Sequence, residues 1–196
     1  MTTRPDYWNK LYEDEGRPGW DMDRATPLVK ELLELALPLG LQPGCELVVP
    51  GCGYGHDAAE LASRGFTVTG MDFAPLAIQG ATQRYGDRVT WSPGDWFTTQ
   101  LGPWDAIFDH TCFVAMDPSR RPDYVAACAE HLRPGGIWMV ALFHEVTRLP
   151  GPPHAIAMDD MRKLAELHFE VLHLDAAKES HPRRAGREFL MVARKR

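Results

Sequence analysis

The stretch Glu46-Leu-Val-Val-Pro-Gly-Cys-Gly-Tyr-Gly-His-Asp57 decides which fold this sequence predicts. A short valine-rich run leads directly into glycines at positions 51, 53 and 55, and a segment of helical character follows from His56 to Arg64. This order is typical of a strand, a tight turn and a helix. Glycine adopts tight-turn conformations at low cost and leaves the peptide N–H groups at the helix start accessible. We therefore expect a flat, polar or anionic ligand to bind at this turn.

The segments after the turn alternate between strand and helix patterns. Phe66 to Asp72 predicts a second strand, and Pro75 begins a helix that runs to about Arg84. Further strands are expected at residues 88–92, 104–109 and 137–143, and the last of these is apolar throughout. Such alternation predicts a parallel sheet that is covered by helices on both faces.

Two late strands depart from this alternation. Residues 169–174 and 188–193 have strand character, and the charged loop between them is too short to hold a crossover helix. They should therefore pair in antiparallel orientation. A length of 196 residues and a hydrophobic content of 44% are enough for one sizeable core, so we expect a single domain.

The residues before the glycine turn predict two helices and a loop. Trp8 and Tyr12 lie one helical turn apart on an aromatic stripe, which is by default a core-packing feature. Trp20 stands in a loop rich in glycine and proline at residues 16–23, where capping a pocket is the alternative to core packing. Thr26 and Pro27 then mark the start of a second helix as its N-cap and first residue.

Several polar residues follow the predicted strands directly. Ligands of parallel α/β sheets bind beyond the carboxyl ends of the strands, so the glycine turn, Asp72, Asp95 and the pair Asp109-His110 should lie together. Asp72 comes about twenty residues after Gly51, where nucleotide-binding units place the acid that accepts from ribose hydroxyls. Taken alone, an acid at this place could also cap a helix.

The charge of the chain narrows the classes of partner. A formal net charge of −6 gives no general attraction to nucleic acid or to an anionic membrane. The pair Arg183-Arg184 is locally basic, and we interpret it as solvated surface. No run of about 18 apolar residues is present, so no membrane span is expected.

Cysteine and histidine usage points to the cytoplasm and to a site without metal. The four cysteines show no CxxC spacing, and the first residues lack the apolar core of a signal peptide. No HExxH motif or cluster of cysteine and histidine occurs among the eight histidines, so we expect no metal.

The spacing of the glycines indicates which kind of ligand the turn binds. A dinucleotide-binding turn needs G-x-G-x-x-G, and His56 stands where its third glycine should be. The sequence Gly-Cys-Gly-Tyr-Gly fits a G-x-G-x-G turn instead, which suits the amino-acid end of a cofactor better than a pyrophosphate.

Motifs in order along nearly the whole chain resemble those of class I S-adenosylmethionine-dependent methyltransferases, and more closely the thiopurine, thiol and halide methyltransferase family. They are Tyr-Trp-Asn-Lys-Leu-Tyr at 7–12, Val-Pro-Gly-Cys-Gly-Tyr-Gly-His-Asp at 49–57, Val-Thr-Gly-Met-Asp at 68–72, Gly-Asp-Trp-Phe at 94–97, Phe-Asp-His-Thr-Cys at 108–112 and Gly-Pro-Pro-His at 151–154. The resemblance implies a doubly wound, Rossmann-like, mostly parallel seven-stranded sheet over residues 45–196 that ends in an antiparallel strand. A helical lid over residues 1–40 would complete the single methyltransferase domain, 1–196.

The resemblance also implies site residues. The cofactor is S-adenosyl-L-methionine, and its predicted contacts are Trp8, Tyr12, Trp20, Gly51, Gly53, Gly55, Asp57, Asp72, Phe73, Asp95, Trp96 and Asp109. His110 is the catalytic candidate, as a group that positions or deprotonates the methyl acceptor. Branches of the family carry arginine or tyrosine at this place, so histidine leaves the acceptor open. The alternative is a strand-end histidine bonded to backbone.

The implied reaction is an in-line displacement that moves the methyl group to a small soft nucleophile such as a thiol, a thiopurine or a halide. Another small metabolite or a metalloid oxyanion is an alternative acceptor. A nicotinamide-dependent oxidoreductase and a noncatalytic nucleotide-binding module are the other classes that we consider. The Asp-Pro-Pro-Tyr signature is absent after the fourth strand, where Asp109-His-Thr-Cys stands, which disfavours nucleic-acid or protein-glutamine substrates. The oligomeric state is left open and is compatible with a monomer.

Overall fold

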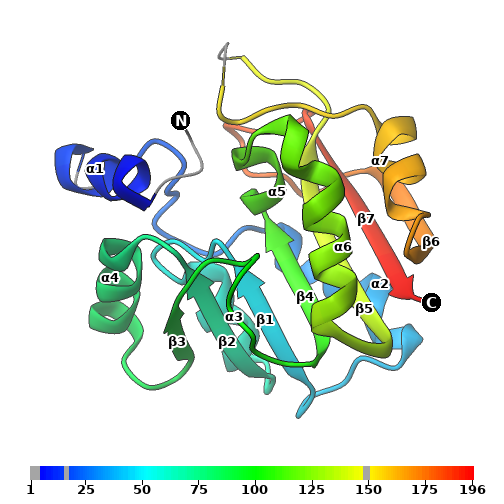
Figure 1. Ribbon diagram of the computed structural model, residues 1–196, viewed down its shortest axis with the longest axis horizontal. Helices are drawn as coiled ribbons and strands as arrows, with labels where there is room; N and C mark the ends of the chain where they lie inside the picture. The colour runs from blue at the N-terminus through cyan, green and yellow to red at the C-terminus, as the bar shows by residue number, and fades with distance from the viewer. Residues whose placement is uncertain (1–4, 16–17, 148–150) are drawn as a thin grey trace.

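The described part of the chain builds a seven-stranded sheet with the strand order β3-β2-β1-β4-β5-β7-β6 (Figure 1). The computed structural model describes residues 5–15, 18–147 and 151–196, so Gly16 and Arg17 of the predicted loop lie outside the described residues. The strands are β1 (Glu46–Pro50), β2 (Thr67–Asp72), β3 (Thr90–Pro93), β4 (Trp104–His110), β5 (Leu132–Phe143), β6 (Phe169–Ala176) and β7 (Glu188–Lys195).

The pairing of the strands follows the predicted fold class. β1 is parallel to β2 and β4, β2 is parallel to β3, and β4 is parallel to β5. β7 is antiparallel to both β5 and β6. The prediction of a mostly parallel sheet with an antiparallel strand near the C-terminus is therefore confirmed.

Helices cover both faces of this sheet, as Figure 1 shows. Because side chains of a strand alternate between the two faces, Trp138 and Val140 of β5 join one core, and Ile137 and Met139 join the other. The first core includes residues of α6 and α7, and the second includes residues of α2 and α3. The longer helices are α1 (Pro5–Glu15), α2 (Leu28–Ala36), α3 (His56–Ser63), α4 (Pro75–Tyr85), α6 (Arg121–His131) and α7 (Met158–Ala165), and α5 (Cys112–Ala115) is a single turn.

The N-terminal helix is fixed to the β3 end of the sheet. In Figure 1, α1 lies beside α4, and α4 in turn lies next to β3. Asn9 Oδ1 accepts a hydrogen bond from the Leu76 N–H at 3.2 Å, and Tyr12 packs against Ala74 and Ala77. The aromatic stripe of α1 is thereby held over the point where β2 ends.

Thr26 joins this N-terminal part to the glycine turn. Its hydroxyl accepts from the Leu28 N–H at 3.4 Å. Leu28 is the first residue of α2, so the helix begins one residue later than predicted. Its own N–H donates to Asp57 Oδ1 at 2.7 Å. The entry to α2 is thus fastened to the first turn of α3.

Candidate active site

A cavity of about 980 Å³ opens beyond the carboxyl ends of β1, β2 and β4. Topology brings most of the predicted site residues to its walls. These are Trp8, Tyr12, Trp20, Gly51, Gly53, Asp57, Asp72, Phe73, Asp95, Trp96 and His110. Gly55 and Asp109 do not line it.

Two of the glycines expose backbone to the cavity. Gly51 and Gly53 have φ angles of 57° and 55°, which favour glycine. A Cβ atom at Gly51 would lie 2.9 Å from Cys112 Sγ, and one at Gly53 would lie 3.2 Å from the Tyr12 hydroxyl. Side chains at these two positions would crowd Cys112 and Tyr12, so the turn keeps bare backbone at the cavity wall.

Gly55 has a different role from the predicted one. Its φ is 81°, and a Cβ atom there would lie 2.3 Å from Cη2 of Trp91, a residue of β3. Since Gly55 is outside the cavity wall, the prediction that it contacts the cofactor does not fit the structure. This glycine is needed for packing against Trp91.

Asp72 ends β2 with its carboxylate at the glycine turn. Oδ2 accepts from the Gly53 N–H at 3.0 Å, and Oδ1 accepts from the Ala74 N–H at 2.9 Å. Burial raises the pKa of Asp72 to about 6, although these backbone hydrogen bonds favour the charged form. Each oxygen keeps capacity for a further donor.

Asp109 lies beneath the site instead of facing it, because a strand directs successive side chains to opposite faces. It is fully buried and accepts from the Cys112 N–H at 3.0 Å and from the Tyr124 hydroxyl at 2.8 Å. Asp109 therefore does not line the cavity in which the cofactor is expected, and its carboxylate holds α5 and α6 to the end of β4. Burial raises its pKa to about 6.

Asp109→Asn should flatten the pH dependence of stability between about pH 4 and pH 6. Because the pKa of Asp109 is raised to about 6, the folded state binds more protons than the unfolded state in this interval. The free energy of unfolding should therefore fall as the pH rises from about 4 to about 6, by up to about 3 kcal/mol from this group. Asp72 acts with the same sign, whereas Asp57, Asp105 and Glu188, whose pKa values are lowered, act with the opposite sign, so the variant should lose only the share of the slope that Asp109 contributes. Denaturant unfolding across this interval measures the slope, and an unchanged slope would contradict the assignment.

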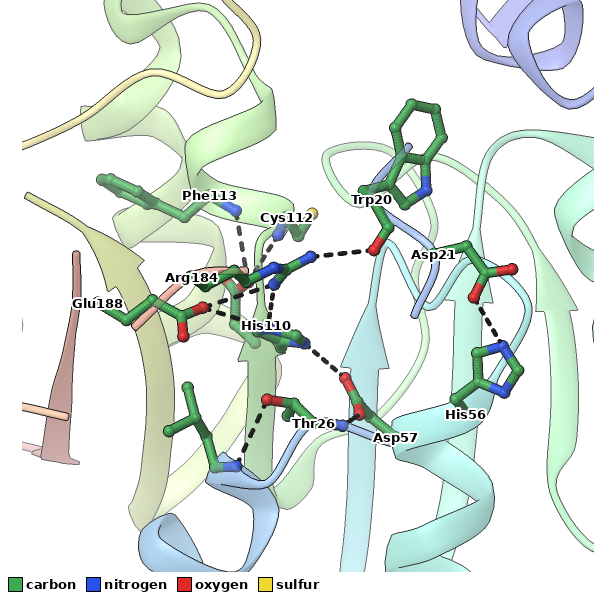
Figure 2. Close-up of polar contacts among 12 residues, drawn as sticks. Trp20, Asp21, Thr26, His56, Asp57, His110, Cys112, Phe113, Arg184 and Glu188 are labelled. Atoms are coloured by element: carbon green, nitrogen blue, oxygen red, sulfur yellow. Dashed lines mark hydrogen bonds and ion pairs between the residues drawn. The ribbon is translucent and has the colours of Figure 1, made fainter. Parts of the chain in front are cut away.

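His110, at the end of β4, belongs to a buried polar network (Figure 2). Its Nδ1 lies 2.8 Å from Asp57 Oδ2, and its Nε2 lies 2.6 Å from Arg184 Nη1. Arg184 also contacts Glu188 Oε1 at 3.5 Å and donates from Nη2 to the Trp20 carbonyl at 3.0 Å. The network thus connects the glycine turn, β4, the start of β7 and the lid loop.

The contact with Arg184 defines the tautomer of His110. A guanidinium only donates, so Nε2 must accept, and the ring proton lies on Nδ1 and is donated to Asp57. Burial lowers the pKa of His110, but the neighbouring carboxylates of Asp57 and Glu188 outweigh it and raise the pKa above its ordinary value. A second proton on Nε2 would face a donor, so we assign the neutral ring to this arrangement, and protonation would require Arg184 to move.

Sequence reasoning missed Arg184. The interpretation of Arg183-Arg184 as solvated surface is wrong for Arg184, which is only 7% exposed. The signal that could have found it is Glu188, an acid at the first position of an apolar strand, where a buried carboxylate needs a cation. Arg184 stands four residues earlier and supplies it.

Aromatic rings from the lid form another wall of the cavity. Trp20 meets Trp8 and Tyr12 edge to face, with ring centroids 5.4 and 5.7 Å apart. Tyr12 also meets Tyr54 of the glycine turn at 5.0 Å. The predicted stripe therefore packs against the turn and at the same time bounds the site.

His56, in place of the third dinucleotide glycine, fastens the lid loop. Its Nδ1 lies 2.6 Å from the Tyr85 hydroxyl on α4, and its Nε2 lies 3.0 Å from Asp21 Oδ1. The side chain that breaks the dinucleotide pattern thus connects α3, α4 and the lid.

The family model for thiopurine S-methyltransferase matches residues 3–193. The chain belongs to the thiopurine S-methyltransferase family. It is therefore a methyltransferase that uses S-adenosyl-L-methionine as methyl donor, which confirms the predicted class, enzyme type and cofactor.

The curated relatives of this family member are named for different methyl acceptors. Thiocyanate methyltransferase 1 of Arabidopsis thaliana is 31% identical, over 93% of this chain and 82% of its own. A thiopurine S-methyltransferase of Photobacterium profundum is 25% identical, over 91% of each chain. Among solved structures, the N-methyltransferase NodS of Bradyrhizobium japonicum has a TM-score of 0.76 at 19% sequence identity. The superposition covers 100% of this chain and 99% of the NodS chain. That likeness bears on the fold alone.

The residues that the structure describes contain no group of three or more His, Cys, Asp or Glu side chains placed to hold a metal ion. Among them, none of the helices combines the length and the apolar character that crossing a membrane requires.

Proposed function

We propose that this protein transfers the methyl group of S-adenosyl-L-methionine to the sulfur of a small thiol, and that Arg184 and His110 form the acceptor end of the site. One observation carries the proposal: a buried guanidinium lines the cavity and is held 2.6 Å from His110 Nε2. A cation in this place favours the thiolate form of an acceptor, which is the reactive form.

The cavity fits the cofactor on features of its own walls. The bare backbone of Gly51 and Gly53 would accommodate the methionine part, and Asp72 would accept from the ribose hydroxyls with its remaining lone pairs. Phe73, Asp95 and Trp96 would border the adenine. Trp8, Tyr12 and Trp20 would close over the cofactor, because aromatic faces attract a cationic sulfonium and exclude water.

For the methyl transfer, the protein has to align the acceptor with the methyl group and to stabilise the charge of the acceptor. When bound, the sulfonium supplies an activated methyl group: the acceptor sulfur forms a bond to the methyl carbon as the bond from carbon to the sulfonium breaks and leaves its electron pair on the neutral thioether product. Arg184 would stabilise the thiolate before attack, with the thiol proton released to water. The lid aromatics would align the acceptor and strip it of water.

His110 has a positioning role in this proposal. Asp57 and Arg184 occupy its two ring nitrogens, so neither is free to take the proton of an acceptor. Asp57 holds the ring through Nδ1, and the ring in turn holds Arg184 through Nε2. This replaces the sequence-based hypothesis that His110 acts as a base.

The relatives support sulfur as the attacking atom of the acceptor. Their names include thiocyanate methyltransferase, probable thiol methyltransferase and thiopurine S-methyltransferase. We extend this only to a small-molecule thiol, methylated by a single domain over residues 1–196. Halides and metalloid oxyanions are the alternative acceptors.

A panel of acceptors tests the function. Aromatic and aliphatic thiols, thiocyanate, iodide and selenite are each incubated with enzyme and S-adenosyl-L-methionine, and S-adenosyl-L-homocysteine and the methylated product are quantified by mass spectrometry. The proposal expects an S-methyl product, with kcat/KM for the best thiol at least about tenfold above that for iodide or selenite. Turnover of halide or oxyanion alone would reassign the acceptor, and cofactor binding without any turnover would point to a noncatalytic module.

A further inference from the structure

The segment between β6 and β7 brings Arg183, Arg184 and Arg187 to one wall of the cavity. This local positive charge contrasts with the net charge of −6 of the whole chain. The cavity acids Asp72, at the end of β2, and Asp95, after β3, lie on the other side of β1 and β4 in the sheet order. Asp57 also lines the cavity, where it is bonded to His110. The three arginines therefore gather on a part of the wall away from Asp72 and Asp95.

Among the described residues, the side-chain partners of Arg183 and Arg187 are neutral groups. Arg183 Nη1 lies 3.7 Å from Met22 Sδ, and its Nη2 donates to the Gly19 carbonyl at 3.3 Å. Arg187 Nη1 donates to the Thr147 hydroxyl at 3.4 Å, and its Nη2 donates to the Arg183 carbonyl. In the ranges that the structure describes, no carboxylate is paired with either guanidinium.

Several other arginines of this protein have their positive charge paired with a carboxylate. On the surface, four are paired with carboxylates: Arg64 with Glu60, Arg133 with Asp105, Arg162 with Glu166 and Arg194 with Glu170. At the cavity, Arg120 is paired with Asp123, and Arg184 contacts Glu188. Arg183 and Arg187 thus leave two positive charges uncompensated beside the cavity, which attracts an anion.

Apolar side chains line the cavity next to these arginines, of which Arg184 is buried and Arg183 is exposed. Met22 contacts Arg183, and the Phe143 ring lies 5.6 Å from the guanidinium carbon of Arg184. Pro152 and Pro153 also line the cavity. A ligand here would place an apolar body against these side chains and an anionic group at its outer end.

We propose that the acceptor is a thiol that also carries a carboxylate, and that Arg183 and Arg187 bind this carboxylate while Arg184 faces the sulfur. A guanidinium matches a carboxylate in shape as well as in charge, because its N–H groups can bond both oxygens. The carboxylate takes no part in the bond changes and serves to orient the acceptor. This inference rests on the proposed thiol methylation.

The test uses a matched pair of acceptors, 4-mercaptobenzoate and its methyl ester. The wild-type enzyme should use the acid with a kcat/KM at least about tenfold above that of the ester, and 0.5 M salt should reduce this preference. In Arg183→Gln/Arg187→Gln the preference should fall to within about threefold of unity, through a higher KM for the acid. Arg162→Gln, which removes an arginine far from the cavity wall, should keep the wild-type preference.

The outcomes separate this inference from the proposed function. Equal use of acid and ester by the wild type, or a preference that survives in the double variant, overturns the carboxylate assignment and leaves thiol methylation standing. Failure to methylate either thiol, or any other thiol, overturns both. Affinity for S-adenosyl-L-homocysteine reports whether the double variant is folded, and a wild-type value makes its changed preference interpretable.

Discussion

Asp72→Ala should lower the affinity for S-adenosyl-L-homocysteine by about 100-fold. The carboxylate accepts from the N–H groups of Gly53 and Ala74, and in the proposed function it also accepts from the ribose hydroxyls. Hydrogen bonds to a charged acceptor contribute about 1.5–3 kcal/mol each, so the loss of two removes about 3 kcal/mol of binding free energy. Isothermal titration calorimetry at pH 8, above the raised pKa of about 6, measures the change in the fully charged state.

The control for this prediction is Asp160→Ala. Asp160 is an exposed carboxylate on α7 that pairs with Lys163 at 3.6 Å, outside the cavity wall. Its removal should change the affinity by less than about twofold. An affinity of Asp72→Ala within about threefold of the wild type would show that the ribose is held elsewhere.

Arg184→Met should destabilise the protein by about 3–5 kcal/mol at pH 8 and reduce thiol methylation by about 100-fold. The substitution keeps an apolar stem but leaves Glu188, which is 2% exposed, without its cation. The lid loop also loses the hydrogen bond at the Trp20 carbonyl. Denaturant unfolding and initial rates measure the two effects.

Two controls separate charge from packing in this result. Arg184→Met/Glu188→Gln removes both charges and should recover at least about half of the lost stability. In Arg184→Met alone, Nε2 of His110 is free to take a proton beside Glu188, 3.7 Å away. Arg184 lowers the pKa of His110 in the wild type, so its loss raises this pKa further. The variant therefore gains more stability than the wild type below about pH 6.5, and the deficit should shrink at pH 6. A deficit that does not change with pH would contradict the network.

His110→Gln complements these controls. With an acidic thiol that is ionised throughout the tested range, wild-type kcat/KM should fall at low pH as His110 gains a second proton and displaces Arg184. The variant should lose the part of this acidic limb that His110 causes and keep the part that Asp72 causes through its pKa of about 6, whereas a merely structural role of His110 would leave the whole limb in place.

The predictable part of the fold follows from local patterns. The valine-rich run before Gly51 and the apolar strand 137–143 mark buried parallel strands, and both are strands in the structure. The loop between residues 174 and 188 is too short for a crossover, which fixes the antiparallel pairing of β6 and β7. Such features depend on neighbours in the sequence, so the sequence alone predicts them.

The site was harder to predict because its contacts join distant segments. Arg184 meets His110 across 74 residues, and nothing local to Arg183-Arg184 distinguishes a buried arginine from a solvated one. Gly55 and Asp109 belong to motifs that line the cavity, but neither faces it. The Cα of Gly55 faces Trp91, and the side chain of Asp109 points toward Tyr124. Motif membership places a residue near the cavity, and the facing of each strand or turn decides whether it reaches the wall.

The position of β7 has a consequence for how this protein is made. β7 is synthesised after β5 and β6 but lies between them and contributes to the cores on both faces of the sheet. Without residues 188–195, β6 therefore has no partner through which to join the sheet. Because Glu188 begins this strand and Arg184 precedes it by four residues, we expect the part of the cavity wall around Arg184 to form only when β7 pairs with β5, a contact between distant segments of the chain.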